Sequence, residues 1–350
     1  MNHNLRGAHP YLTAASPGIG GRIRVLPEDF QVEELPLYLP CGTGEHLYIR
    51  VTKRLLSTPD LVRKLSSVLG VKVQAIGTAG MKDARAVTTQ MVSLQFVTPE
   101  QVARLTPDDR ILAVEVLGRH RNRLRPGHHA GNRFRLVVRD VAGYAQQTVP
   151  AVLQTLERRG VPNYFGPQRQ GKSGENFRLG AALLTDSARR AKMSRVQRMW
   201  YLNSFQSHLF NRILARRIER IDRMLLGDWA MKMDNGACFA VDDPEKEQPR
   251  ADRFEISPTG ILFGSRVSWA SGEPGEMEQE AAVEEGETPQ TLIDAARSCG
   301  FRGERRSLRV RLEGVEWSLS RDVLTVQFSL PPGSYATSVL RELMKDPHLH

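Results

Sequence analysis

Cysteine is scarce in this sequence of 350 residues: Cys41, Cys238 and Cys299 are scattered thiols, and no Cys-x-x-Cys pair occurs. An odd, sparse set of this kind argues against a disulfide framework and against a structural zinc site. Reduced thiols are the simpler interpretation, and they are typical of the cytoplasm. We therefore expect a cytoplasmic protein that holds no metal.

Long apolar runs are also missing. No stretch of about eighteen apolar residues is present, so a membrane span is not expected. Residues 1–21 lack the apolar core of a signal peptide. The hydrophobic content of 40% and the charged content of 25% are those of a soluble globular protein. A chain of this length can form two domains with cores of their own.

Acidic residues are outnumbered, since 49 Lys and Arg against 39 Asp and Glu give a formal net charge of +10. This surplus favours a polyanionic partner, nucleic acid first and an anionic membrane second. A role on membrane surfaces fits poorly, because no amphipathic basic helix ends in an apolar anchor. Residues 119–129 contain four arginines and three histidines. Such a segment suits phosphate contacts, and a solvated charged loop explains it equally well.

The spacing of apolar residues predicts strands and helices in alternation. Strands are expected at residues 47–53, 87–97, 110–117, 134–138, 308–312 and 323–330. Helices are expected at residues 58–69, 99–105, 148–158, 196–226 and 338–344. Residues 228–300 read as loop-rich, with short strand-like pieces around Phe239 and Leu262. The acidic stretch 273–287 would repel phosphate. The long helix 196–226 has an apolar stripe for the core and an arginine face that either touches RNA or is solvated.

One short stretch brings a single carboxylate between cations. Asp83 follows Lys82 and precedes Arg85 on a glycine-led turn, between an apolar segment and the strand 87–97. Glycine and aspartate suit any ordinary turn. Loops held by rigid elements are nevertheless where reactive groups usually lie, so Asp83 is a candidate catalytic residue.

Seven short motifs follow one another between about residue 21 and residue 345. They are Pro27-Glu28-Asp29-Phe30 with Val32 and Glu33; Gly42-Thr43-Gly44-Glu45-His46; Gly80-Met81-Lys82-Asp83 with Ala86-Val87-Thr88 and Gln90; Gly131-Asn132-Arg133-Phe134; Val161-Pro162-Asn163-Tyr164-Phe165-Gly166 with Gln168-Arg169; Ser207 with Leu209-Phe210-Asn211; and Gly333-Ser334-Tyr335-Ala336-Thr337 with Val339-Leu340-Arg341-Glu342. In this order the set resembles the TruD family of tRNA pseudouridine synthases. Residues 228–305 contribute almost nothing to the resemblance.

The resemblance implies isomerisation of uridine to pseudouridine at position 13 of tRNA, without cofactor or metal. It implies an α+β fold in which a bipartite pseudouridine synthase catalytic domain, built on a mixed, largely antiparallel sheet, flanks an inserted TRUD domain. We place the two catalytic parts at residues 1–157 and 307–350 and the inserted domain at 158–306. A monomer with tRNA as its partner is expected.

The same resemblance assigns roles to single residues. Asp83 matches the catalytic aspartate, Phe134 the aromatic that stacks on the target base, and Asn132 the amide beside the aspartate. From the residues alone, a core phenylalanine and a turn asparagine explain the last two as well. The sequence departs from the family at Arg24, where a lysine is common, and at Gln170, where a phenylalanine is usual.

Five further residues complete the expected substrate site. They are Lys82, Arg24, Gln90, Glu45 and His46. Ordering of the loop that contains them is an alternative role for Glu45 and His46.

The reaction breaks the N1–C1′ bond, turns the uracil over and joins C5 to C1′. One carboxylate can stabilise or attack the positive character that develops on the sugar. It can instead remove the C2′ proton and give a glycal. Flipping the base out of its stack costs a few kcal/mol, which stacking on Phe134 would offset. The alternative hypothesis is a non-catalytic RNA-binding or RNA-folding protein.

Overall fold

The computed structural model describes residues 9–171 and 174–346, and these form two compact units. The first, which we call the sheet unit, consists of Ile19–Gln147 and Leu312–Ser334. The second, the helical unit, contains the described residues up to Gly18, Thr148–Arg311 and the residues from Tyr335 onward. Helices and strands are mixed along the chain, so the predicted α+β class is confirmed.

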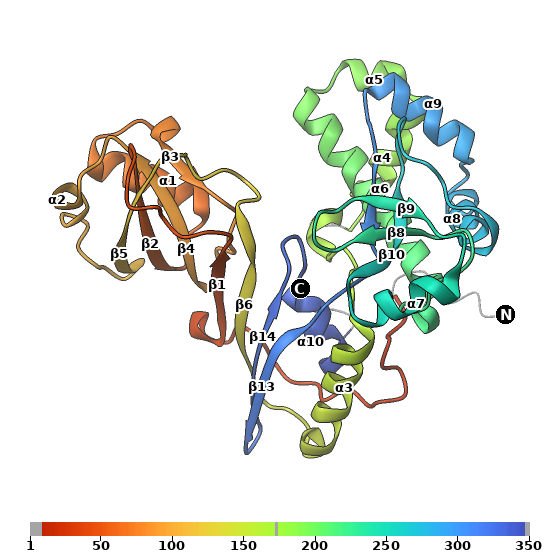
Figure 1. Cartoon of the computed structure of the whole chain (residues 1–350), viewed down its shortest axis with the longest axis horizontal. Coiled ribbons are helices and arrows are strands. Elements are labelled where there is room, and N and C mark those ends of the chain that lie inside the picture. The colour runs from red at the N-terminus through yellow and green to blue at the C-terminus, as the bar shows by residue number, and fades with distance from the viewer. Residues whose placement is uncertain (1–8, 172–173, 347–350) are drawn as a thin grey trace. The chain divides into compact units, whose positions relative to one another are not determined.

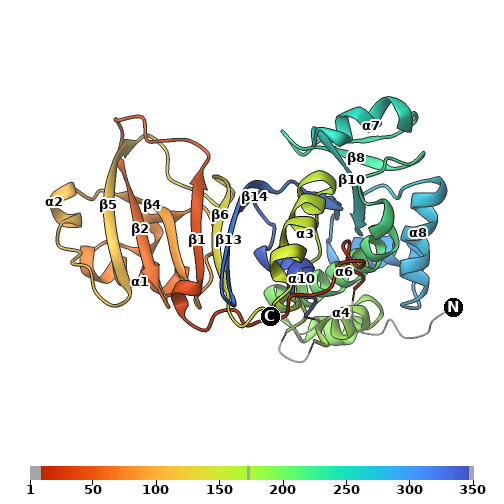
Figure 2. The same cartoon turned by 90° about the horizontal axis from the view of Figure 1, so that it is seen from below.

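The sheet unit is organised around an eight-stranded sheet in the order β13-β14-β6-β1-β4-β2-β5, with β3 paired to β4 (Figures 1 and 2). The strands are β1 (Phe30–Pro36), β2 (His46–Arg54), β3 (Ile76–Thr78), β4 (Val87–Gln95), β5 (Ile111–His120), β6 (His129–Val138), β13 (Glu313–Ser320) and β14 (Val323–Leu330). Strands β1 and β4 are parallel, and the other pairs of this sheet are antiparallel. The predicted mixed, largely antiparallel sheet is therefore confirmed.

Helix α1 (Thr58–Leu69) covers one face of this sheet. The Ser57 side chain accepts a hydrogen bond from the Asp60 backbone N–H and caps the start, while Gly70 ends the helix at a φ of 68°. Leu61 and Leu65 are buried against apolar residues of β2 and β4. The predicted helix 58–69 is confirmed. The next helix, α2 (Pro99–Val102), is shorter than the predicted 99–105.

The helical unit packs around α6 (Arg195–Arg217), which buries Phe205 and Phe210. Its other helices are α3 (Ala145–Arg159, whose first residues belong to the sheet unit), α4 (Asn176–Thr185), α5 (Ser187–Ala191), α7 (Pro244–Asp252), α8 (Gly272–Val283), α9 (Pro289–Cys299) and α10 (Ala336–Met344). A sheet runs in the order β11-β10-β8-β9, and β7 (Val161–Pro162) pairs with β12 (Arg309–Val310). The strands of that sheet are β8 (Trp229–Lys232), β9 (Cys238–Ala240), β10 (Ile256–Leu262) and β11 (Glu304–Ser307).

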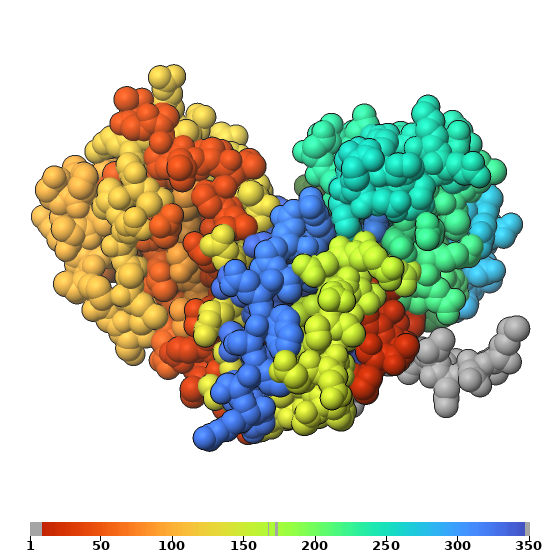
Figure 3. Space-filling view, turned by 60° about the horizontal axis from the view of Figure 1, so that its bottom comes forward, coloured from red at the N-terminus to blue at the C-terminus, as the bar shows by residue number. Residues whose placement is uncertain are grey.

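An N-terminal arm, residues 9–18, is held in the helical unit. The backbone N–H groups of Leu12 and Thr13 donate to the carboxylate of Glu342 on α10, at 3.0 and 2.9 Å. Arg341 donates to the Pro10 carbonyl and lies over the ring of Tyr11. In Figure 3 the arm is the red segment beside the lime α3. These contacts explain why the arm groups with the C-terminal helix.

Several element boundaries differ from the predictions. Strand β6 begins at His129 rather than residue 134, so Asn132 lies within a strand and not in a turn. The cationic segment 119–129 likewise starts and ends in strands. Helix α6 ends at Arg217 and is followed by a short 3-10 helix, not by helix to residue 226. Strand β13 was not predicted, because it is an edge strand on which exposed and partly buried residues alternate without a buried apolar set.

The region 228–300 is the largest correction. It was expected to be loop-rich with short strand-like pieces around Phe239 and Leu262. Those two pieces are confirmed as β9 and β10, whereas β8 and three helices among the described residues were not expected. The acidic stretch forms most of α8, which includes Pro274 and Gly275 in its first turns and so hides its helical pattern. Within residues 9–171 and 174–346, no helix combines the length and the apolar content needed to cross a bilayer.

Candidate active site

The loop between β3 and β4 covers one face of the large sheet. Val32 and Glu34 are buried on that face of β1, because alternate strand residues point to the same side. On the neighbouring strand β6, Phe134 lies opposite Val32 and Asn132 opposite Glu34. Directly opposed residues of antiparallel strands share a face. Lys82 of the loop contacts both Glu34 and Asn132, so the loop lies over this face.

Asp83 is held by two donors and remains open to solvent. Its Oδ2 accepts a hydrogen bond from the guanidinium of Arg24 at 2.6 Å, and its Oδ1 accepts from the backbone N–H of Arg85 at 2.8 Å. The second contact is the turn that aspartate forms with its own backbone. The side chain is 27% exposed. The carboxylate is therefore fixed in position but not sealed.

Arg24 adopts a backbone conformation that is unusual for its residue type. Its φ is 55°, and a non-glycine residue in this left-handed region is uncommon. The guanidinium lies 4.3 Å from the ring centre of Phe30, two residues before Val32 on the same face of β1. The strained backbone and the stacked ring together aim the guanidinium at Asp83.

Lys82, next to Asp83, points the other way. Its Nζ lies 2.7 Å from Oε2 of Glu34, which is fully buried, and donates to Oδ1 of Asn132 at 2.9 Å. Its backbone N–H donates to Oγ1 of Thr58, at the start of α1, at 2.9 Å. Only 4% of the Lys82 side chain is exposed. The loop is thus anchored from below by a buried ion pair and by α1.

Phe134 lies between these two groups on the sheet face. Arg24, which binds Asp83, lies over the ring of Phe30, and Lys82 forms an ion pair with Glu34. Phe134 is opposite Val32, which lies between Phe30 and Glu34 on this face of β1. Its ring centre is 5.6 Å from that of Phe328 on β14, and the residue is 6% exposed. The structure therefore brings Asp83, Arg24, Lys82, Asn132 and Phe134 together.

Further buried polar side chains lie under the loop. Gln90 is buried on β4, and its Oε1 accepts a hydrogen bond from Thr58 at 3.0 Å. Lys53, opposite Thr88 in the β2–β4 register, is fully buried and donates to the Leu56 carbonyl. Burial lowers the pKa of Lys53 to about 8. The negative charge of Asp83 opposes this lowering, and the positive charge of Lys82 adds to it. The pKa of His129 is also lowered, by burial and by the charge of Lys82.

Glu45 and His46 are not brought to Asp83. His46 opens β2 opposite Gln95, whereas Lys53 lies near the other end of the strand. Seven residues of strand separate the two levels by roughly 24 Å. Glu45 is exposed and accepts a hydrogen bond from Gln95 at 3.3 Å, and burial lowers the pKa of His46.

The cationic segment 119–129 is partly used for internal contacts. Arg119 and Arg123 donate to the backbone carbonyls of Val97 and Ile76. Leu124 is buried, and its N–H donates to Ser93 at 2.9 Å. Of the two interpretations of this segment, phosphate contacts or a solvated charged loop, neither describes Arg119 and Arg123 fully, because their guanidinium groups also hold the segment on the sheet.

Sequence reasoning missed Glu34, Lys53 and Thr58. Each is a polar residue at a position that the strand or helix pattern turns inward. Glu34 continues the alternation of Phe30 and Val32, and Lys53 follows Ile49 and Val51 in the same phase. An inward-facing charge within a regular strand was the available signal.

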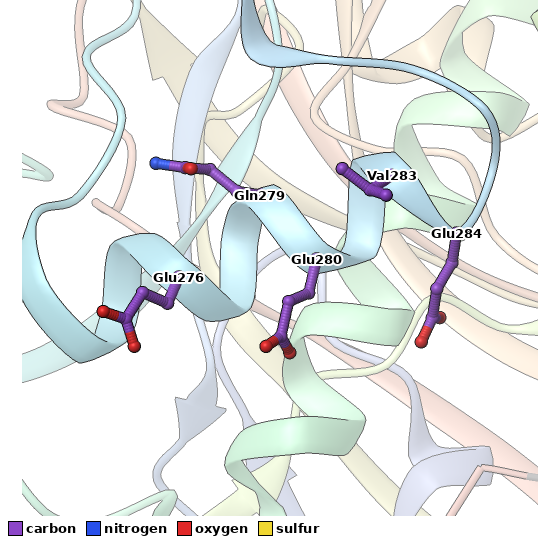
Figure 4. Close-up of a pocket in the computed structure, with 5 residues that line it drawn as sticks. All are labelled: Glu276, Gln279, Glu280, Val283 and Glu284. Carbon is purple, nitrogen blue, oxygen red and sulfur yellow. The ribbon is translucent and has the colours of Figure 1, made fainter.

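The side chains that could bind a metal ion are not grouped into a site. Among residues 9–171 and 174–346, no group of three His, Cys, Asp or Glu side chains could hold one. The ionic neighbours of Asp83 are cations, which disfavour a further cation there. A hollow on the helical unit is lined by Glu276, Gln279, Glu280, Val283 and Glu284 of α8 and its end (Figure 4). Its carboxylates would repel a polyanion, and none of its lining residues belongs to the candidate site.

The second departure from the family pattern is accommodated locally. Gln170 lies in a short 3-10 helix (Pro167–Gln170), and its Oε1 accepts a hydrogen bond from the Ser204 hydroxyl at 2.6 Å. Its Nε2 donates to the Ser204 carbonyl at 3.2 Å. The amide thus finds polar partners on α6 where a phenylalanine ring would be expected to pack.

Comparison with known proteins gives a consistent result. The sequence profile of the family described as tRNA pseudouridine synthase D (TruD) matches residues 7–198 and 187–343. The tRNA pseudouridine synthase D of Geobacter sulfurreducens is 42% identical, covering 96% of this chain and 97% of that protein. The one from Anaeromyxobacter dehalogenans strain 2CP-C is 44% identical, covering 96% of each. A crystal structure from Methanosarcina mazei described as TruD superposes with a TM-score of 0.84 at 25% identity, over 98% of both chains. The chain belongs to the TruD family.

Proposed function

We propose that this chain is a tRNA pseudouridine synthase that converts uridine 13 of tRNA to pseudouridine, with Asp83 as the catalytic carboxylate. Relatives that carry the name tRNA pseudouridine synthase D match it over nearly their whole length. The observation that carries the assignment of Asp83 is its setting. Asp83 is a solvent-accessible carboxylate on its loop, and the neighbouring Lys82 does not compete for it because Lys82 forms a buried ion pair with Glu34. A soluble tRNA substrate is consistent with a cytoplasmic protein.

The chemistry asks for an ionised carboxylate beside the ribose. Arg24 holds the Asp83 carboxylate through a charge-assisted hydrogen bond. As the N1–C1′ bond breaks, positive character grows on the sugar, and the carboxylate stabilises it or bonds to C1′. Alternatively, the carboxylate removes the C2′ proton. Both routes use the Asp83 carboxylate beside the ribose.

The residues around Asp83 divide into two roles. Lys82, Glu34 and Gln90 are buried, and we assign them to positioning the loop. The Oδ1 of Asn132 accepts a hydrogen bond from Lys82. The amide N–H groups of Asn132 are then left to donate to a carbonyl oxygen of the uracil. Phe134 is largely buried near Phe328 and would meet the flipped base only through the small part of it that is exposed.

Glu45 and His46 are assigned to ordering their own turn, since they lie at the far end of β2. The sheet unit carries the candidate site, and its two segments fall within the expected catalytic parts 1–157 and 307–350. No group from outside the chain is needed for the proposed steps.

The activity is tested by incubating the purified chain with unmodified tRNA and mapping pseudouridine at each position. Conversion at position 13 supports the proposal, provided that Asp83→Asn, prepared in parallel, gives none. Uridine 13 that stays unmodified in every tRNA offered contradicts it. Tight tRNA binding without conversion would favour the alternative, a non-catalytic RNA-binding or RNA-folding protein.

A further inference from the structure

A long segment of the helical unit is free of acidic residues. From Ser187 to Arg217 the sequence contains no Asp or Glu but has eight Lys and Arg residues. This segment comprises α5, the turn after it and α6 (Figure 1). Such a run concentrates positive charge, and the structure shows how each part of that charge is used.

The arginines in the C-terminal half of α6 are neutralised within the unit. Arg212 and Arg216 form ion pairs with glutamates at the end of α8, among them Glu284. Arg217 is buried and forms a bidentate pair with Asp228, at 2.9 and 3.1 Å. This arginine face was expected either to touch RNA or to be solvated; the guanidinium groups of these three residues are instead paired with carboxylates of the same unit. The acidic stretch in and after α8 supplies the counter-charges of Arg212 and Arg216, and Asp228 supplies that of Arg217.

The cations at the other end of α6 have a different setting. Arg189, Lys192 and Arg195 are exposed and Arg198 is half-buried, and none has an ion pair with a described residue. Arg190, in contrast, is used internally and donates to the last carbonyls of α4, including that of Leu184 at 2.7 Å.

Exposed apolar groups lie among these free cations. Val196 is 80% exposed and Trp200, four residues later on the same side of α6, is 49% exposed. The ring of Trp200 tilts against that of Tyr201 at a centre separation of 5.6 Å. A solvated charged surface does not require an exposed tryptophan, whereas cations interleaved with aromatic rings are typical of nucleic-acid contacts.

The placement of two of the arginines is unfavourable for the helix itself. Arg195 and Arg198 lie in or beside the first turn of α6, which has no acidic residue. Positive side chains at this end oppose the helix dipole and cost a fraction of the helix stability each. Ser194 and Gln197 form a capping box at this helix start, but no described acidic residue pairs with Arg195 or Arg198. An external anion is therefore the natural counterpart of this surface.

We propose that Arg189, Lys192, Arg195, Arg198 and Trp200, the α5–α6 patch, bind the tRNA at a place other than the nucleotide that is modified. The four cations would contact backbone phosphates, and the indole would stack on an exposed base or ribose. This inference rests on the proposed function for the identity of the RNA. It assigns a tRNA contact to a surface of the helical unit that contains no candidate catalytic residue.

The test compares two double variants of the full chain, each of which removes two positive charges. Lys192→Gln/Arg195→Gln removes patch cations. Arg63→Gln/Arg253→Gln removes arginines that are highly exposed and already paired with Asp60 and Glu255. Binding to unmodified tRNA is measured across a series of salt concentrations.

The patch variant is expected to bind roughly tenfold more weakly at low salt. Its slope of log affinity against log salt should fall by about two, because two phosphate contacts are lost. The matched control should keep the wild-type slope. The KM of the patch variant for modification should rise, while its kcat at saturating tRNA stays unchanged.

Trp200→Ala separates stacking from charge. It is expected to weaken tRNA binding by about tenfold with an unchanged salt slope, whereas Trp200→Phe should retain most of the affinity. Equal binding by the patch variant and the wild type overturns the proposal, and so does an equal loss in the control. Unchanged tRNA binding with weaker binding to anionic phospholipid vesicles would also overturn it. Altered tRNA binding with a wild type that forms no pseudouridine would keep the patch and reject the proposed function.

Discussion

Two adjacent residues of one loop, Lys82 and Asp83, have opposite environments. The Lys82 ammonium is buried on Glu34, whereas the Asp83 carboxylate is partly exposed beside Arg24. The N–O distances of the two ion pairs are similar, 2.7 and 2.6 Å, but the Lys82–Glu34 pair is buried against the sheet, whereas the Arg24–Asp83 pair is partly exposed. In the first pair each charge depends on the other, because neither has water to replace its partner.

This difference separates the residue that anchors the loop from the carboxylate that we propose as the catalytic group. A catalytic group must be held in place by something other than its own contacts to the substrate. The Lys82 side chain and backbone N–H fix the loop to β1, β6 and α1. Asp83 is then free to use its carboxylate on a ligand. Exchanging or removing the members of each pair tests this division.

Asp83→Asn is expected to have the largest effect. Removing the carboxylate while keeping its shape should lower the single-turnover rate of pseudouridine formation by at least about a thousandfold. The tRNA dissociation constant should change by less than about threefold, because the anchoring pair is intact. If tRNA binding and thermal stability fall together with the rate, Asp83 is a structural residue and the division is wrong.

Glu34→Gln is expected to act on folding first. It leaves the Lys82 ammonium buried without a counter-charge, which costs about 3–5 kcal/mol of unfolding free energy. Urea unfolding followed by circular dichroism measures the loss. Much of the total stability of a domain can be lost in this way.

The double variant Lys82→Met/Glu34→Leu distinguishes stability from positioning. Replacing a buried ion pair by apolar side chains of similar size often restores stability, so we expect unfolding close to that of the wild type. The rate of modification should still be reduced by about tenfold or more, with KM for tRNA little changed. Full turnover in this double variant would show that the pair only supports the fold.

Much of the frame could be predicted from the sequence. Local signals were sufficient for α1, which has a cap, a proline and a closing glycine, and for β14, whose alternation has one buried face. The ordered motifs singled out Asp83, Asn132 and Phe134 as candidates; the structure brings them to one face, and their roles stay predictions. Local patterns carry this information because neighbouring residues define it.

The directions of the side chains could not be predicted in the same way. Lys82 turns inward because Glu34 and Thr58, both distant in sequence, meet it there. The arginines of α6 divide into paired and unpaired sets because α8 packs against only part of the helix. Such choices depend on tertiary contacts between charged groups, and composition or periodicity does not contain them.

Substitutions of Arg24 test the partly exposed Arg24–Asp83 pair. Arg24→Ala removes the charge-assisted hydrogen bond to Asp83 and should lower the modification rate by roughly ten- to a hundredfold. Arg24→Lys keeps the charge with a different geometry and should retain activity within about tenfold of the wild type. Kinetics at saturating tRNA measure both. A lysine variant as slow as the alanine variant would show that hydrogen-bond geometry, rather than charge, is required.

Lys53 provides the smallest effect and a contrast with Lys82, because it is a buried lysine whose ammonium donates to a carbonyl and not to a carboxylate. Burial lowers its pKa to about 8, below its ordinary value of 10.5. Between these values the folded chain binds fewer protons than the unfolded chain, so this group makes stability rise with pH.

The wild type should accordingly gain about 1 kcal/mol of unfolding free energy from this residue between pH 8 and pH 9. Lys53→Met, which removes the titrating group, should lack that gain, and the difference between the two chains isolates it from other titrations. Urea unfolding at both pH values measures it. An identical pH dependence in the two chains would mean that Lys53 keeps an ordinary pKa, and that a buried lysine at this sheet face is stabilised without a carboxylate such as Glu34.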